Sequence, residues 1–589
     1  MDEKLSRVIE ENFKIEGNEG ESKIVSLREA VRQNVRPGMA LHFTEEAGAA
    51  MCEVLRQYWG QSPHFTLVMS TPAGTHAINM IHAGLVKKLI FTNCSDLYPT
   101  PRPNPIVCAA FEGKEVELEN WSVLSFVQRL IAGAWGIGFM PTKSIVGSDI
   151  AEENKDSFQM MDDPFGSGRK LGVVKALNPH LAFVHGWAAD PYGNTIVSPF
   201  HVYTLWGAKA SRNGVVVTVE KIVSTEFIRE HSSFVKIPGY MVRSVSLAPL
   251  GAHPQGLVSH GLADFEAYDQ DNAFLADMRK ASEDAAALDD WIRHWVLDTE
   301  THEDYLRKLG QERILFLKGK GNRDAWEYEL AAVADTISTS DQYTATEMMI
   351  VAAARQMRDI ILENRYRVLF GGIGGAALAG WLAYYLLKKQ GYVVELVGPG
   401  IGSAPRPGDP FLINQANMPT FKMLTDALDI HGTCVTGETN LCLGLIGAAQ
   451  VDRFGNINST KIGGKIYIAG SGGSNDMASG AREVITMAAQ SKTRLVEKVS
   501  FITCPGGRVK TLVSNMAIFE KVGGDPEFTL TRYFPDPTHR TLDERIKEIK
   551  ETCGWDLKVS SELTEVPPPA SEELLILRLF DPRGYFLQP

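Results

Sequence analysis

Short apolar runs rich in valine, isoleucine and leucine alternate along this chain with longer amphipathic stretches. We expect strands at residues 40–43, 64–70, 87–92, 180–186 and 214–223 in the first half, and at 366–372, 391–398, 441–450, 465–470 and 499–504 in the second. Stretches between several of these runs, such as 26–33 and 46–59, have helical spacing. Apolar strands separated by helices are typical of parallel sheets covered on both faces. The pattern therefore predicts an α/β protein with two tandem open α/β domains, each a mostly parallel sheet covered by helices.

A five-residue motif occurs once in each half, directly after an apolar run. It reads Asp-Pro-Tyr-Gly-Asn at 190–194 and Asp-Arg-Phe-Gly-Asn at 452–456. In such a turn the Asp caps the backbone, Gly accepts a positive φ and Asn tolerates left-handed geometry. Two copies at matching places indicate duplicated α/β domains. We place these domains at 1–317, with a charged helical extension from about residue 264, and at 341–589, with a linker at 318–340.

Length, charge and cysteine content limit the classes of protein to which the chain can belong. A chain of 589 residues is too long for one core, so two or more domains are expected. The net charge of −12 is spread along the chain without a basic stripe, so we expect no nucleic-acid partner. Seven cysteines without CxxC spacing indicate reduced thiols and a cytoplasmic location. We do not expect the acidic, amphipathic N-terminal stretch to be a signal peptide.

An uncharged run at 368–387 is long enough to raise the question of a membrane span. Four glycines at 371, 372, 374 and 375 interrupt it, so we expect a buried strand, a loop and a helix, and no membrane partner. The histidines are scattered among apolar and loop positions without HxxxH or HExxH spacing. No metal site is therefore expected.

Longer segments resemble the class I coenzyme A transferase superfamily. In the first half, residues 22–39, 117–144, 163–168 and 183–194 are similar to the larger of the two subunits of glutaconate-type CoA transferases. In the second half, residues 343–359, 443–464 and 469–481 are similar to the smaller one. The resemblance implies that two subunit types are joined head to tail. It also implies coenzyme A as a substrate, with an acyl-CoA and a carboxylic acid as partners, and no metal. We further expect a homo-oligomer.

In these transferases a strand-end glutamate of the smaller-subunit half attacks the acyl-CoA and comes to carry CoA as a thioester. The usual Glu-Ser-Gly or Glu-Asn-Gly is replaced here by Glu-Leu-Val at 395–397. Aligned forward from the helical stretch 378–390, Glu395 takes the nucleophile position. Aligned backward from Gly402 and Pro405, Val397 takes it and the nucleophile is missing. Glu395 is therefore either the nucleophile or a supporting carboxylate.

A second carboxylate is implied by the ring-cleaving relatives, in which a glutamate from the region of Glu119 serves as the base. The alternative is an acid beside Asn120 at the start of a helix, where the helix dipole favours a negative charge. Glu45 and Glu46 stand where relatives often carry a glycine-rich loop, which puts a binding role for that loop in question.

Two glycine loops are candidates to bind CoA or a thioester oxyanion through backbone N–H groups. Their residues are Gly371, Gly372, Gly470, Gly472, Gly473 and Asn475. The alternative for the second loop is a tight strand-to-helix turn in which Asn475 or Asp476 caps the helix.

We therefore expect a CoA transferase that acts through a glutamyl-CoA thioester. One alternative is an acyl-CoA hydrolase, with or without carbon–carbon cleavage, or a decarboxylase of the same superfamily that uses a different carboxylate. The other is a non-catalytic acyl-CoA-binding protein. The sequence does not identify the acyl group or the acceptor acid.

Overall fold

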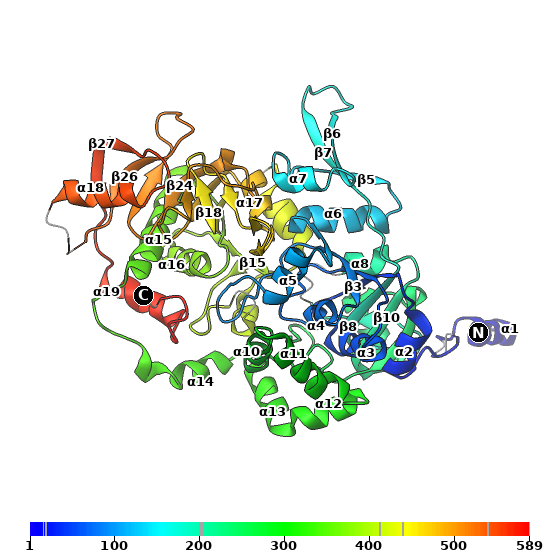
Figure 1. Ribbon diagram of the computed structural model, residues 1–589. Coiled ribbons are helices and arrows are strands. Elements are labelled where there is room, and N and C mark those ends of the chain that lie inside the picture. The colour runs from blue at the N-terminus through cyan, green and yellow to red at the C-terminus, as the bar shows by residue number, and fades with distance from the viewer. Residues whose placement is uncertain are drawn as a thin grey trace.

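The strands gather into two large sheets, one in each half of the chain (Figure 1). The computed structural model describes residues 1–587 except 16, 18, 19, 200–204, 412, 413, 439, 440, 537, 539 and 540. In Figure 1 the first half, coloured blue to green, and the second half, coloured green to red, lie side by side.

The first sheet has nine strands, and seven of them run parallel in the order β12-β10-β8-β1-β2-β3-β4. These are β1 (Ala40–Phe43), β2 (Phe65–Val68), β3 (Val86–Phe91), β4 (Glu117–Asn120), β8 (Leu181–Ala189), β10 (Val215–Ile222) and β12 (Val242–Leu247). The short strands β9 (Thr195–Ile196) and β11 (Val235–Ile237) pair antiparallel beyond β8. All nine residues of β8 are buried because strands flank it and helices cover the sheet.

Helices cover both faces of this sheet. One face packs against α2 (Leu27–Asn34), α3 (Gly48–Tyr58), α4 (Ala77–His82) and α5 (Pro105–Gly113). The other face, through Val68 and Ile90, packs against α6 (Val123–Ala134). The first core also takes in apolar residues of α10 (Asn272–Ala281) and α11 (Ala285–Ile292). The charged extension after residue 264 therefore packs an apolar side onto the first half.

The second sheet has ten strands, of which β14, β13, β17, β22 and β24 are adjacent and parallel. In sheet order the strands are β16 (Met423–Leu424), β15 (Gly400–Ser403), β14 (Glu395–Val397), β13 (Val368–Phe370), β17 (Cys442–Gly447), β22 (Glu483–Met487), β24 (Val509–Val513), β25 (Ala517–Glu520), β26 (Thr529–Tyr533) and β27 (Lys558–Glu565). One face packs against α15 (Ala345–Asn364), α16 (Gly375–Lys389) and α19 (Ser571–Leu579). The other packs against α17 (Ser474–Gly480) and α18 (Leu542–Glu551). The predicted fold class is confirmed.

The uncharged run at 368–387 divides as expected into the strand β13 and the helix α16. Among the described residues, no helix is both long and apolar enough to span a membrane. The predicted linker at 318–340 contains the end of α13 (Gln311–Lys320) and the short helix α14 (Ala325–Ala331). The domain boundaries themselves stay a prediction.

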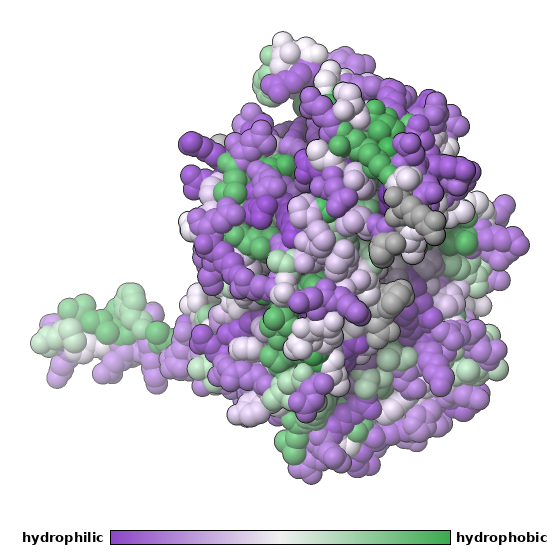
Figure 2. Space-filling model, turned by 90° about the vertical axis from the view of Figure 1, so that its left-hand side faces the viewer, coloured by the Kyte–Doolittle hydropathy of each residue, from purple (hydrophilic) through white to green (hydrophobic). Residues whose placement is uncertain are grey.

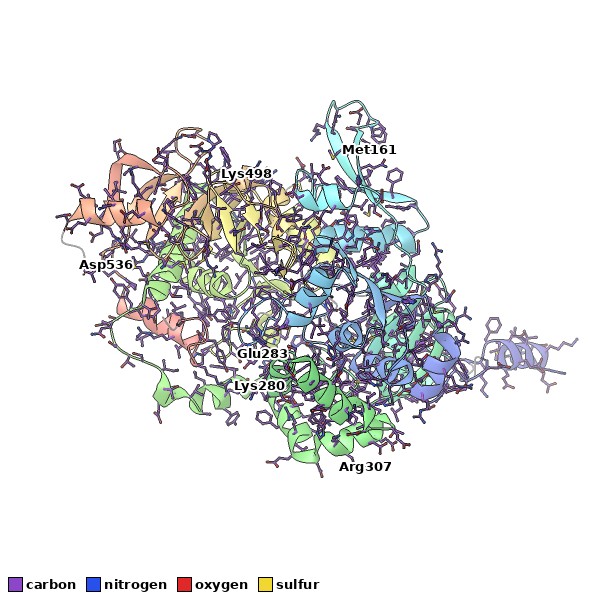
Figure 3. All side chains as sticks on the ribbon, viewed as in Figure 1. Met161, Lys280, Glu283, Arg307, Lys498 and Asp536 are labelled. Atoms are coloured by element: carbon purple, nitrogen blue, oxygen red, sulfur yellow. The ribbon has the colours of Figure 1, made fainter. Side chains whose placement is uncertain are left out.

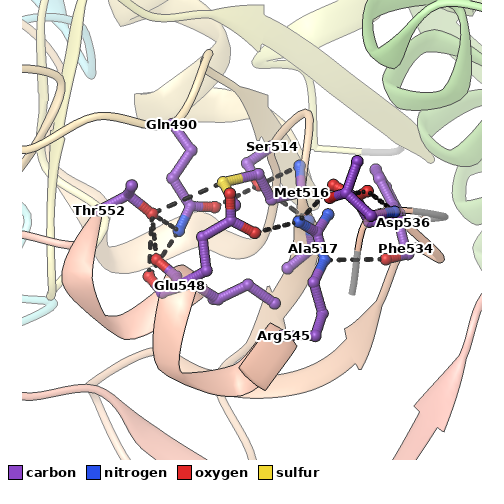
Figure 4. Close-up of polar contacts among 11 residues, drawn as sticks. Gln490, Ser514, Met516, Ala517, Phe534, Asp536, Arg545, Glu548 and Thr552 are labelled. Atoms are coloured by element: carbon purple, nitrogen blue, oxygen red, sulfur yellow. Dashed lines mark hydrogen bonds and ion pairs between the residues drawn. The ribbon is translucent and has the colours of Figure 1, made fainter. Parts of the chain in front are cut away.

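A polar network attaches α18 to the sheet of the second half (Figure 4). The Gln490 side chain donates to the Ile549 carbonyl at 2.8 Å and accepts from the Ser514 hydroxyl at 2.7 Å. Arg545 donates to the Phe534 carbonyl at 3.1 Å and pairs with Glu548 on its own helix. These buried bonds fix a helix whose outer face is strongly charged. By contrast, α1 (Glu3–Asn12) extends away from the body without a buried residue, as the projection in Figure 2 shows.

The two Asp-x-aromatic-Gly-Asn turns have the same hydrogen bonds in both halves. Asp190 Oδ1 accepts the N–H groups of Tyr192 and Asn194 at 3.1 and 2.9 Å, and Asp452 Oδ1 accepts those of Phe454 and Asn456 at 3.0 Å each. Each turn glycine has a positive φ, 96° for Gly193 and 76° for Gly455.

The match continues beyond the turns. The Asn194 side chain accepts the N–H of Gly239 at 2.9 Å, and the Asn456 side chain accepts that of Gly506 at the same distance. A lysine ammonium then donates to the carbonyl of each of these glycines, Lys23 at 2.7 Å and Lys521 at 2.8 Å. This repeated set of contacts supports the duplication that the sequence predicts.

Replacing either turn aspartate is expected to destabilise its own half. Asp190 and Asp452 are fully buried, so an alanine leaves two backbone donors unpaired at a cost of about 3 kcal/mol. We expect Asp190→Ala to lower the urea midpoint for unfolding of the first half, and Asp452→Ala to lower that of the second half. Unfolding is monitored by tryptophan fluorescence and by proteolysis of each half. The exposed Asp162→Ala on β6 (Phe158–Asp162) is the control. Unchanged unfolding in both variants contradicts this role.

Candidate functional site

A cavity of about 820 Å³ lies between the two halves and is lined by residues of both. From the first half it takes the segments that follow β1, β2 and β3, including Glu45, Thr71 and Asn93. From the second it takes the segments that follow β13 and β17, including Gly372 and Ala448. The carboxyl ends of the parallel strands of both sheets therefore face one cavity, which is where open α/β sheets bind ligands. We call it the central cavity.

Two adjacent carboxylates, Glu45 and Glu46, line the central cavity directly after β1. The Thr71 N–H donates to Glu45 Oε1 at 3.2 Å. Burial and the neighbouring Glu46 raise the pKa of Glu45 to about 8, and burial raises the pKa of Glu46 as well. The family resemblance places a glycine-rich loop at these positions. Here the segment instead contributes two carboxyl groups to the edge of the cavity.

Asp96 is the third cavity carboxylate within the described chain. It is bound by the Asn104 amide at 2.7 Å and by Arg102 Nε at 3.2 Å. Arg102 in turn pairs with Glu283, which follows α10 and is labelled in Figure 3. Asp96 is therefore held in a structural network, whereas Glu45 and Glu46 have no ion-pair partner among the described residues.

Glu395 does not line the central cavity. It begins β14 and lies level with Val368, whereas the cavity begins at Phe370, about 7 Å further along the strands. Both carboxylate oxygens contact the Lys422 ammonium, at 2.7 and 3.0 Å, and the pair is partly exposed. The nucleophilic role of Glu395 stays a prediction, and its position favours the supporting-carboxylate alternative.

Glu119 also lies outside the cavity, in a cluster of cations. It pairs with Arg129 at 2.5 Å and with Lys88 at 2.6 Å, and it accepts from the Trp121 indole N–H at 2.8 Å. Burial opposes the charge, but Arg129 and Lys88 keep the pKa of Glu119 below its ordinary value. This arrangement supports the structural alternative over a catalytic base. The neighbouring Asn120 instead accepts the Ser471 N–H at 3.0 Å.

The glycines of both predicted loops line the cavity, as expected for a binding site. Gly372 lies just before the N-terminus of α16, and Gly473 lies just before that of α17. Within the described chain, neither N–H donates to a protein acceptor. Gly470 and Gly472 donate theirs to the carbonyls of Ser459 and Thr92, at 3.1 and 2.9 Å. Gly372 and Gly473 are therefore better placed than Gly470 and Gly472 to bind an oxyanion.

The loop at 469–476 forms the main polar contact between the halves, which we call the seam. The Gly472 N–H donates to the Thr92 carbonyl, and the Val123 N–H donates to the Gly472 carbonyl at 3.0 Å. Asn475 faces the seam and not the cavity, since its side chain accepts the Ile145 N–H at 2.7 Å. The role of Asn475 in binding CoA therefore stays a prediction without support from its position.

Behind this loop lies a histidine that no sequence motif singles out. His431 lines the cavity, and its Nδ1 is 3.4 Å from Asp476 Oδ2. A Cβ on Gly473 would stand 2.3 Å from His431 Cε1, so the glycine makes room for the imidazole. No sequence signal indicates that residues 431 and 476 meet, because only the tertiary fold brings them together.

Neutralising Glu119 is expected to destabilise the first half without removing a cavity group. In Glu119→Gln the buried Arg129 loses its carboxylate, which costs about 3 kcal/mol. Glu117→Gln is a matched control, because Glu117 is on the same strand and pairs with the same Lys88 but is 66% exposed. The free energy of unfolding in urea and the affinity for an acyl-CoA should be measured for both variants. Loss of binding in stably folded Glu119→Gln would restore the catalytic alternative.

Comparison with known proteins identifies the family of the chain. A family model described as Coenzyme A transferase matches residues 24–248 and 415–536. The A subunit of glutaconate CoA-transferase from Acidaminococcus fermentans is 31% identical over 229 residues, which are 35% of this chain and 67% of that protein. The B subunit of 3-oxoadipate CoA-transferase from Pseudomonas knackmussii is 30% identical over 261 residues, which are 41% of this chain and 94% of that protein.

Among solved structures, an acyl-CoA transferase of Escherichia coli O157:H7 in a thioester complex with CoA has a similar fold. The TM-score is 0.63 at 16% identity, and the match covers 95% of this chain and 96% of that one. The family model matches segments in both halves, and the two relatives above represent the two different subunit types of such transferases. The chain therefore belongs to the coenzyme A transferase family, with the two subunit types of that family joined in one polypeptide.

Proposed function

We propose that the chain moves CoA between an acyl-CoA and a carboxylic acid in the central cavity, with Glu45 as the carboxylate that carries CoA. The observation that supports this assignment is the placement of Glu45 and Glu46, which line the cavity where both sheets end. Neither forms an ion pair with a lysine or arginine of the described chain, and His185 is the charge partner of Glu46. Glu395 is separated from the cavity and paired with Lys422.

The proposed reaction begins when the ionised Glu45 attacks the thioester carbonyl carbon. The carbonyl oxygen becomes an oxyanion, for which we propose the N–H groups of Gly372 and Gly473 as donors because both glycines line the cavity. The carbon–sulfur bond then breaks and leaves an acyl-glutamyl anhydride with a CoA thiolate. The thiolate attacks the Glu45 carbonyl carbon and releases the first carboxylate, which leaves a glutamyl-CoA thioester. A second carboxylic acid takes the CoA by the reverse steps.

The neighbouring Glu46 would control the charge of this group. Two carboxyl groups side by side in a cavity of low dielectric do not both ionise readily, so the pair tends to share one proton. Burial and Glu46 keep the proton on Glu45 up to a pH of about 8, so attack requires the form of the pair in which Glu45 has lost its proton. The ionised Glu45 is then poorly solvated and therefore reactive.

The relatives support CoA and a carboxylic acid as the substrates, since two of them are named as subunits of glutaconate and 3-oxoadipate CoA-transferases. The predicted association of this chain into a homo-oligomer and its cytoplasmic location stay predictions.

Mass spectrometry tests the assignment directly. The chain is incubated with a short acyl-CoA without acceptor acid, and the digest is searched for CoA attached to a glutamate. We expect the adduct on the peptide that contains Glu45, its loss in Glu45→Gln, and its persistence in Glu395→Gln. An adduct on the Glu395 peptide would refute the assignment in favour of Glu395.

The alternative functions give other results in the same experiment. Consumption of the acyl-CoA without an adduct would favour hydrolysis or decarboxylation, and binding without consumption would favour a non-catalytic protein. A CoA-transfer assay with acetate as the acceptor completes the measurement, and Glu45→Gln should lower kcat by about 10³-fold or more.

The raised pKa of Glu45 predicts a pH-dependent cost to stability. The folded chain keeps the proton up to a pH of about 8, whereas the unfolded chain releases it near 4.5. Between these pH values the folded state therefore binds more protons than the unfolded state. The contribution of Glu45 to the free energy of unfolding falls as the pH rises from about 4.5 to 8. Relative to wild type, Glu45→Gln should gain unfolding free energy at about pH 8 but not at about pH 4.5. An equal difference at both pH values in urea unfolding contradicts the shift.

A further inference from the structure

We propose that His431 is a general base of the central cavity, oriented by Asp476, and that it gives the site a second activity in which water cleaves the acyl-CoA thioester. This inference rests on the proposed function only in that the cavity binds an acyl-CoA. It does not require a glutamyl-CoA intermediate.

The imidazole of His431 is held on three sides. Its ring lies 5.4 Å from that of Phe370, at an interplanar angle of 59°. Gly473 lies so close that any side chain there would meet the ring. Asp476 faces Nδ1 at 3.4 Å. The residue is only 4% exposed, so its orientation is fixed by packing.

Asp476 is itself fully buried and bound from the opposite half. Its Oδ1 accepts the Ser144 hydroxyl at 2.7 Å, and its Oδ2 accepts the Leu124 N–H at 3.0 Å. These donors come from the first half, whereas Asp476 and His431 belong to the second. The histidine–carboxylate pair is therefore complete only when the two halves are docked.

The arrangement selects one tautomer of His431. Burial raises the pKa of Asp476, whereas His431, the Ser144 hydroxyl and the Leu124 N–H favour its ionised form. An ionised Asp476 favours a proton on Nδ1, which lies 3.4 Å from Oδ2 and has no hydrogen-bond partner in the described chain. The lone pair is then on Nε2, the ring nitrogen left to meet a ligand in the cavity. Burial lowers the pKa of His431 while Asp476 raises it, so the carboxylate opposes the loss of basicity that burial causes. A buried histidine oriented by a carboxylate is the usual form of a general base.

The proposed reaction balances without a further reactant. Water gives a proton to His431 Nε2 as its oxygen bonds to the thioester carbonyl carbon. The N–H groups of Gly372 and Gly473, which line the cavity and have no protein acceptor in the described chain, are the proposed donors to the resulting oxyanion. When it collapses, the carbon–sulfur bond breaks, and the departing CoA sulfur takes the proton from Nε2. The products are a free carboxylic acid and CoA, and His431 returns to its neutral form.

The acceptor acid of CoA transfer attacks as a carboxylate, so it needs no base to activate it. The pair of His431 and Asp476 is therefore unexplained by the transfer reaction, although His431 lines the same cavity. Water is the acceptor that requires a base, which is why the pair points to hydrolysis.

The test is the release of CoA from a short acyl-CoA by the full chain without acceptor acid. His431→Gln should lower the rate of hydrolysis about 10²- to 10³-fold while leaving KM within about threefold. His82→Gln is the matched control, because His82 also pairs with a carboxylate, Asp289 at 2.9 Å, but lies outside the cavity. Equal losses in both variants, or no hydrolysis by wild type, would overturn the proposal.

Asp476 acts as a positioning residue, so its test needs a readout beyond the rate. In Asp476→Asn the His431 cation loses its carboxylate, so the acid limb of the hydrolysis pH profile should move to lower pH. A seam defect alone would lower the rate without moving that limb. Asp476 is the charged group that the described structure places against the imidazole.

Two further outcomes separate this proposal from the one on Glu45. Glu45→Gln should lose the CoA adduct and keep hydrolysis, whereas His431→Gln should do the opposite. Loss of hydrolysis in Glu45→Gln would mean that water attacks a Glu45 intermediate, which overturns direct attack on the thioester. Exchange of substrate α-hydrogens with D₂O that depends on His431, without hydrolysis, would also overturn it, because the base would then act on carbon.

Discussion

The hydrogen bonds of the seam are the constraint on which the rest of the structure depends. The loop before α17 donates and accepts backbone hydrogen bonds at the carboxyl ends of β3 and β4, as its contacts with Thr92 and Val123 show. These groups are buried, so they would be unpaired in a dry interface if the halves shifted by even one residue. The seam thereby fixes which strand ends face each other, and with them the shape of the cavity.

The chemistry of the cavity comes from groups that the fold places in unfavourable surroundings. Glu45 and Glu46 have raised pKa values because burial disfavours their charge, and His431 keeps a ring nitrogen without a well-aligned partner in the described chain. Such groups reduce stability, and proteins keep them where reactivity requires it. Glu119 and Arg129 show the contrast, because there each buried charge has an opposite charge at 2.5 Å. The same residue type is therefore paired with cations in a structural network at Glu119, and lies in the cavity at Glu45, where we propose that it reacts.

Much of the fold could be predicted from the sequence because period and turn chemistry are local properties. The alternation of apolar strands with helices, and the two turns at Asp190 and Asp452, needed no knowledge of distant contacts. The position of Glu395 could not be settled in this way. Which end of β14 reaches the cavity depends on its pairing with β13, and the forward and backward alignments of this strand differ by two residues.

The glutamate pair and the histidine of the cavity were harder to predict from the sequence, for different reasons. Glu45 and Glu46 were visible as a departure from a glycine loop, but only the facing half shows that this loop meets a cavity. His431 is in an irregular π-helical turn (Leu428–Val435), and its carboxylate is 45 positions away. The contact between His431 and Asp476 is set by tertiary packing around Gly473. Such packing produces no periodic pattern in the sequence.

The covalent connection between the halves has a consequence for their assembly. Helices α13 and α14 lead from the first half toward α15, so each first half is tethered to one second half. A short tether of this kind holds two modules at an effective concentration in the millimolar range. The wall that carries Glu45 and the wall that carries His431 therefore find each other within one molecule, and dilution that would separate free subunits leaves this site intact.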